Sequence, residues 1–76
     1  MKELVAVLAK AIVDQPDAVT VAEHEGEDGT MVLELTVASD DVGKVIGRQG
    51  RVIKAIRMVV KAAAAKEGRK VAVEVV

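Results

Sequence analysis

The chain has 76 residues, of which 51% are hydrophobic, and it contains no cysteine and no Phe, Tyr or Trp. This is the length of one domain, residues 1–76, and the composition excludes disulfides, Cys-based zinc sites and base stacking on aromatic rings. The sequence also contains no expected signal peptide or membrane-spanning segment. Together with the lack of cysteine, this indicates a cytoplasmic protein. The net charge of −1 hides a polarised chain, because residues 1–42 carry two Lys and ten acids whereas residues 43–70 carry nine Lys or Arg and one acid. An anionic partner is therefore expected for the second half.

The first part of the chain predicts a helix followed by a β-hairpin. Residues 2–14 repeat apolar side chains at helical spacing, and Pro16 ends the helix because the residue before a proline avoids the helical conformation. Residues 18–25 and 30–37 alternate with a period of two, which predicts two strands with one buried face each. The segment between them, Gly26-Glu27-Asp28-Gly29, has the composition of a hairpin turn.

The second part predicts two helices and a third strand. Ser39-Asp40-Asp41 is a candidate N-cap for a short helix that reaches about Ile46. A longer helix is expected over Arg51–Lys66, with Gly68 as its terminator. Residues 70–76 alternate again and predict a strand. The order of elements is thus α-β-β-α-α-β.

The longer helix is expected to carry a basic face. At 100° per residue, Lys54, Arg57 and Lys61 fall within about 60° of one another, nearly opposite the apolar positions that would pack on the sheet. Such a face is ordinary on a solvated helix. Here, however, no acid lies among residues 51–66 to form stabilising pairs at a spacing of four. Unrelieved positive charge favours an anionic ligand.

Two glycines, Gly47 and Gly50, separate the two predicted helices. A Gly-x-x-Gly pattern alone is weak, since it recurs at Gly26–Gly29, where a turn explains it. The second copy leads into the N-terminus of the basic helix, where unpaired N–H groups and the helix dipole favour an anion. Glycines also let a phosphate backbone approach closely. Lys44, Arg48, Arg51, Lys54 and the amide of Gln49 surround the same turn.

The segment VIGRQGRVIKAIR, residues 45–57, resembles the signature of the KH domain, an I-G-x-x-G loop between two helices. The order of elements is similar to the type II arrangement, and the whole chain resembles the small single-domain bacterial RNA-binding proteins of the KhpA (YlqC) family. The resemblance implies an α+β fold in which three helices pack on one face of a three-stranded mixed sheet. The crossover before the third strand agrees with a parallel pair.

The resemblance also implies a function, which is non-catalytic binding of single-stranded RNA with no cofactor. The loop would clamp the backbone of about four nucleotides, and aliphatic side chains would contact the bases. The site residues expected from it are Gly47, Arg48, Gln49, Gly50, Lys44, Arg51, Lys54, Val45, Ile46 and Ile53. The implied protein partner is a second copy of the chain or a larger KH-containing protein of the KhpB/Jag type.

Three other functions fit parts of the sequence. A helix-turn-helix DNA reader also has a basic helix after a glycine turn, but the first helix here is barely two turns long and strands surround the pair. A protein-interaction or dimerisation module would use the same Gly47–Gly50 loop, with the broad apolar face of the first helix or Met58 on the basic helix as further contact surface. An enzyme is disfavoured, because His24 lies among acids on the outer side of a strand and no nucleophile–base pair can be assembled.

Overall fold

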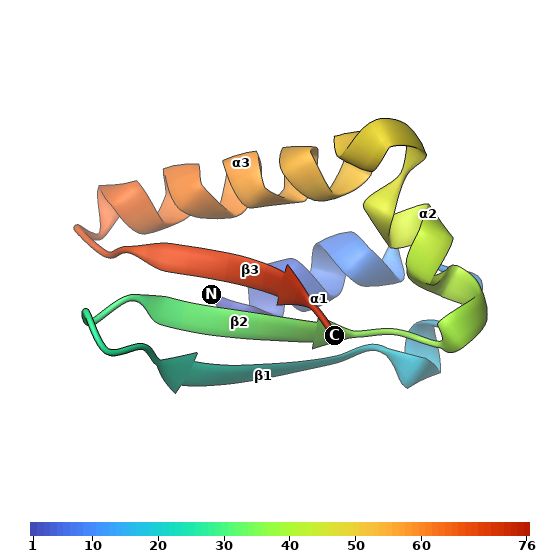
Figure 1. Ribbon diagram of the computed structural model, residues 1–76, viewed down its shortest axis with the longest axis horizontal. Helices are drawn as coiled ribbons and strands as arrows, with labels where there is room; N and C mark the ends of the chain where they lie inside the picture. Colours follow the sequence, from blue (N-terminus) through green and yellow to red (C-terminus); the bar gives the residue numbers. More distant parts are fainter.

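The computed structural model describes all 76 residues, and its elements follow the predicted order (Figure 1). The helices are α1 (Lys2–Lys10), α2 (Val42–Ile46) and α3 (Arg51–Lys66), and the strands are β1 (Thr20–Glu25), β2 (Met31–Thr36) and β3 (Val71–Val75). Single 3₁₀ turns cover Pro16–Ala18, Ser39–Asp41 and Arg48–Gly50. The long helix has the predicted bounds. None of the helices combines the length and apolar character needed to cross a bilayer.

The three strands form one mixed sheet in the order β1-β2-β3, as predicted. Strands β1 and β2 are antiparallel and place Val21 opposite Leu35. Strands β2 and β3 are parallel and place Leu33 opposite Val73. Strand β3 is therefore an edge strand, and α3 runs alongside it (Figure 1).

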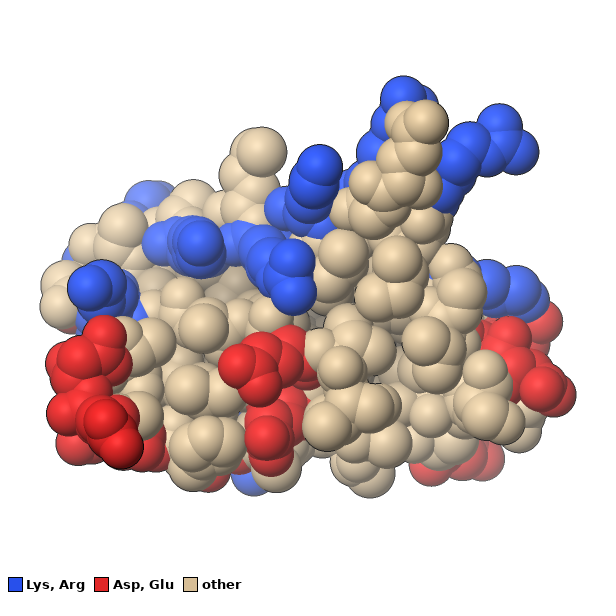
Figure 2. Space-filling view, viewed as in Figure 1, with Lys and Arg blue, Asp and Glu red and all other residues tan.

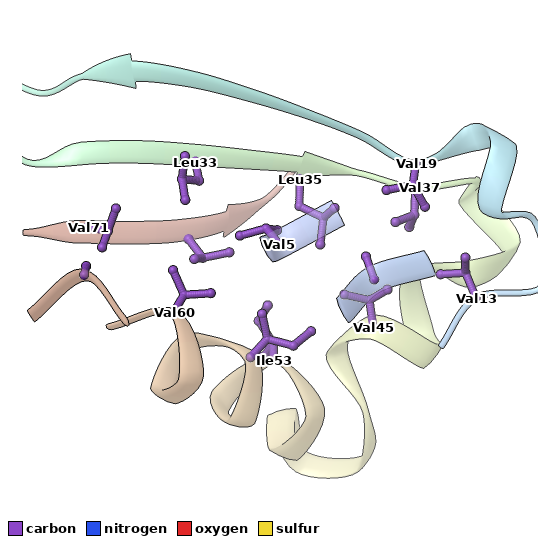
Figure 3. Close-up of a cluster of buried hydrophobic side chains, with 14 residues drawn as sticks. Val5, Val13, Val19, Leu33, Leu35, Val37, Val45, Ile53, Val60 and Val71 are labelled. Carbon is purple, nitrogen blue, oxygen red and sulfur yellow. The ribbon is translucent and has the colours of Figure 1, made fainter. Parts of the chain in front are cut away.

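The core lies between the sheet and the helices, which all cover the same face (Figure 3). It consists of fourteen buried aliphatic residues, among them Val5 of α1, Leu33 and Leu35 of β2, and Ile56 and Val60 of α3. Burial of each large side chain stabilises the fold by about 1.5–3 kcal/mol. The core is thus built without aromatic residues, from packed Val, Leu, Ile and Ala side chains.

The other face of the sheet is open, as expected from its polar alternate positions. Thr36 and Glu74 are exposed there and Glu34 is half-buried. His24 also lies on this face, with its Nδ1 atom 3.9 Å from Glu34 Oε1. The position of His24 is that of a solvated surface residue, and no group of three or more His, Cys, Asp or Glu side chains is placed to hold a metal ion.

The start of α2 differs from the sequence-based prediction. No side chain of Ser39, Asp40 or Asp41 caps a helix. Instead, Asp41 is 1% exposed and accepts hydrogen bonds from the backbone N–H groups of Asp14, at 3.2 Å, and Gln15, at 3.0 Å. Asp41 therefore holds the predicted N-cap position of α2, but its side chain does not cap the helix. The carboxylate joins α2 to the segment after α1, and α1 itself ends at Lys10 rather than at Asp14.

Candidate nucleic-acid interface

The glycine loop, Gly47–Gly50, forms the sharp turn between α2 and α3. Gly47 has φ 76° and ψ 170°, a conformation that essentially only glycine adopts. A Cβ atom at Gly47 would lie 2.4 Å from Val52 Cγ2 and 2.8 Å from the Val52 backbone nitrogen. Gly50 is in the left-handed region, with φ 74° and ψ 18°, and an added Cβ there would meet nothing within 4 Å. Gly47 therefore permits the close packing of the turn, whereas Gly50 leaves the outer surface bare.

Gln49 stands at the exposed tip of the glycine loop. It adopts φ 60° and ψ 23°, and it is the only residue other than glycine with a positive φ. Its side-chain oxygen accepts a hydrogen bond of 3.1 Å from Arg51 Nη2. The Gly50 N–H donates to Gly47 O at 3.1 Å, which closes the turn. A left-handed glutamine costs stability, and such strain is common at binding sites.

Three of the four predicted cations surround this turn without an ionic partner. Arg48, Arg51 and Lys54 are exposed, and none forms a salt bridge. No side chain caps the N-terminus of α3, so the first-turn N–H groups have no side-chain acceptor. The loop therefore combines bare main chain, a positive helix end and free positive charge, which together suit a phosphate group.

Lys44 is placed differently from the other three. Its ammonium group donates a hydrogen bond to Asp14 Oδ2 and lies 3.9 Å from Asp41 Oδ1. The hydrogen bond with Asp14 raises the pKa of Lys44. Two acids thus pair with the positive charge that the sequence assigned to the site. Through Asp14, Lys44 also links α2 to the segment that follows α1.

The three aliphatic residues expected in the groove do not share one environment. Val45 is 0% exposed and Ile53 is 4% exposed, and both lie between the helices and the sheet (Figure 3). These two residues belong to the core and support the loop from below. Ile46 is half-buried, as is Val52, so Ile46 alone of the three keeps accessible surface beside the glycine loop.

Sequence reasoning missed a groove between α3 and β3. This α3–β3 groove, about 340 Å³ in volume, is lined by Arg57, Lys61, Ala72, Val73 and Glu74. Arg57 Nε donates a hydrogen bond of 3.0 Å to Val73 O on the free edge of the sheet. The basic spacing of Lys54, Arg57 and Lys61 was visible in the sequence, but the position of β3 beside it was not. Figure 2 shows Lys and Arg side chains gathered over α3 and the glycine loop.

An apolar groove lies on the other side of α3, against α1. It is about 190 Å³ in volume, and only hydrophobic residues line it: Leu8, Ile12, Val52, Ala55, Ile56 and Val59. Val59 of α3 is 47% exposed, and Val7 of α1 is 65% exposed. Helix α3 therefore separates a cationic surface from an apolar one.

Solved structures with the same fold include two of Era. Era in complex with MgGDPNP and nucleotides 1506–1542 of 16S ribosomal RNA has a TM-score of 0.67 and 21% identity to this chain. Era from Aquifex aeolicus has a TM-score of 0.66, also at 21% identity. In both cases the similarity covers 97% of this chain and 28% of the Era chain. At this identity the likeness shows the fold alone, and the fold is the predicted one.

Comparison of the sequence with known families gives a match over almost the whole chain. The model of the KhpA/KhpB KH domain matches residues 2–75. The RNA-binding protein KhpA of Clostridium perfringens is 58% identical over 76 residues, the full length of both chains. That of Treponema pallidum is 45% identical over 75 residues, 99% of this chain and 92% of the relative. These names agree with the expectation of a protein without catalytic activity. Because both the family match and the relatives span the domain, the chain belongs to the KhpA/KhpB family of KH domains.

Proposed function

We propose that this domain binds single-stranded RNA through the glycine loop and the adjoining end of α3. The observation that supports the proposal best is the combination of bare main chain at Gly50 with three unpaired cations, Arg48, Arg51 and Lys54. The relatives at 58% and 55% identity are named RNA-binding proteins. In the cytoplasm, such a domain would act in post-transcriptional regulation.

The loop and the α3–β3 groove have complementary roles in this proposal. The loop amides and the cations hold phosphates, and the strand then follows α3 toward Lys61. Ile46 and the stems of Arg57 and Lys61 contact the bases by shape. Aromatic stacking, worth about 1–3 kcal/mol per base in other single-strand binders, is absent, so affinity and sequence selectivity of the isolated domain are low.

Charge reversal at the loop tip tests the proposal. Both Arg48 and Gln49 are exposed, so R48D/Q49D should abolish binding to a short single-stranded RNA while the thermal transition stays cooperative. The variant K2D/Q15D is a matched control, because it changes the net charge equally at exposed positions outside the loop. Unchanged RNA binding by R48D/Q49D would refute the role of the loop, and loss of self-association instead would make the loop a protein interface.

The salt dependence of binding provides an independent measure of the phosphate contacts. If three or four phosphates are neutralised, log affinity should fall with log salt concentration with a slope of about −2 to −3. A slope near zero would exclude a phosphate clamp. Preference for duplex DNA over single-stranded RNA would favour the helix-turn-helix alternative, although the three-stranded sheet speaks against it.

The apolar groove supports a second part of the proposal, which is pairing with another copy of this chain or with a KhpB/Jag-type KH protein. Val7 and Val59 present side chains to solvent beside an apolar groove, and pairing would bury them. Val59→Lys should therefore shift the sedimentation of the protein toward the monomer. Met58→Lys is the control, since Met58 is 71% exposed on the same helix but does not line the groove. Monomeric wild-type protein at all concentrations would exclude self-pairing.

A further inference from the structure

A cationic pocket lies at the end of α3 that is far from the glycine loop. This far pocket is about 440 Å³ in volume and is lined by Thr30, Lys61, Arg69, Lys70, Val71 and Ala72. Its side chains come from the residue before β2, from α3 and from β3 with the connection that leads into it. Three of its six residues are therefore cations, contributed by segments that only the fold brings together.

The cations of the far pocket are free to meet a ligand. Lys61, Arg69 and Lys70 are exposed, and none of them forms a salt bridge. The charge of Lys70 acts on one acid, Asp28. The pKa of Asp28 is lowered mainly by hydrogen bonds with Thr30, and the charge of Lys70 is the smallest of the causes. Asp28 Oδ1 accepts the Thr30 N–H at 3.1 Å, so that acid is engaged in its own turn. The pocket thus keeps a surplus of positive charge.

The far pocket adjoins the α3–β3 groove. Lys61 lines both the far pocket and the α3–β3 groove, so the two share a wall. Lys61 lies ten residues after Arg51, which corresponds to about 15 Å along the helix axis. Ala72 of β3 lines both hollows as well, so the two follow one another along α3 and β3.

We propose that the far pocket binds a phosphate group of the same RNA strand that the glycine loop clamps. The inference rests on the proposed function and extends it, because the strand is then anchored at both ends of α3 rather than at the loop alone. A clamp at the loop accounts for about four nucleotides. With two anchors, the domain distinguishes long single strands from short ones, which gives it length selectivity without a base-specific contact.

The test compares oligoribonucleotides of about four and about eight residues of one sequence. A single four-nucleotide site finds about five registers on eight nucleotides, so lengthening alone raises affinity by a factor of about five. For the wild-type protein the gain should exceed this factor. For R69Q/K70Q it should fall to this factor, and the salt slope with the longer RNA should decrease by about 0.7 for each phosphate that is no longer neutralised. The control K2Q/K10Q removes two exposed lysines from α1 and should behave as the wild type.

A second measurement identifies the source of the phosphate. The amide NMR signals of Arg69, Lys70 and Ala72 should move when the longer RNA is added and stay in place with the shorter one. If inorganic phosphate alone moves them to the same end point and the longer RNA does not, the pocket binds free phosphate and the proposal is wrong. An equal gain from lengthening in wild type and R69Q/K70Q would also overturn it, with the proposed function intact. If neither RNA binds the wild type, both proposals fail.

Discussion

The packing of Gly47 against Val52 gives a prediction about how the glycine loop keeps its shape. In Gly47→Ala, the new Cβ would lie 2.4 Å from Val52 Cγ2 in a backbone conformation that essentially only glycine adopts. Backbone strain costs about 1–3 kcal/mol and overpacking about another 1–3 kcal/mol. The sum, about 2–6 kcal/mol, is a large part of the stability of about 4–11 kcal/mol expected for a domain of this length.

Urea denaturation of Gly47→Ala and Gly50→Ala measures this cost. Gly50→Ala is the matched control, because it meets nothing within 4 Å and should lose only the left-handed penalty of about 1–2 kcal/mol. Adding Val52→Ala to Gly47→Ala removes the nearest atom, so the double variant should show a coupling of about 0.5–3 kcal/mol. Equal losses for the two glycines, with no coupling to Val52, would refute the packing argument.

Three further predictions concern the charged residues. Asp41→Asn should lower the free energy of unfolding by about 1–3 kcal/mol, because the NH₂ of the new amide group then faces one of the two backbone N–H groups. Asp40 is exposed, so the control Asp40→Asn should change this free energy little. Equal effects of the two substitutions in urea denaturation would contradict the role of the Asp41 hydrogen bonds. The hydrogen bonds with Thr30 lower the pKa of Asp28, so they stabilise the fold above the ordinary value of 3.8, and this contribution is lost as the pH falls through the lowered pKa. Asp28→Asn should therefore be less stable than wild type at pH 7, and the difference should shrink with acidification in urea denaturation; a difference that stays constant with pH would contradict this. Lys44→Gln should weaken RNA binding less than Arg51→Gln in a fluorescence titration, because Asp14 already holds the Lys44 ammonium group; the reverse order would return Lys44 to the phosphate site.

Local sequence signals were sufficient for most of the fold. The alternating strands and the bounds of α3 depend on periodicity and on glycine at a helix end, which neighbouring residues determine. The positive φ of Gly29 in the hairpin turn likewise follows from what glycine permits. These features are correct because each is decided within a few residues of chain.

The sequence did not reveal contacts between residues distant in the chain. Asp41 was correctly predicted as an N-cap residue, but the hydrogen-bond partners of its side chain lie 27 and 26 residues earlier. Lys44 was assigned to the site because it lies next to the glycine loop in the sequence, whereas its hydrogen-bond partner Asp14 lies 30 residues earlier in the chain. Val45 was expected at the floor of the groove beside the loop and is fully buried, and α2 is too short for its sequence to show which face meets the core. The far pocket was invisible for the same reason.

The separation of charge along the chain has a consequence for how the domain meets a polyanion. Figure 2 shows Lys and Arg over the side that carries α3, and Asp and Glu over the opposite side with the hairpin. Because the net charge is only −1, the domain as a whole is not attracted to a polyanion over long distances. The separated charges form a dipole, however, and the field of the polyanion rotates the domain until its basic side faces the polyanion. Productive encounters would then arise by reorientation, and added salt would slow association by screening that torque.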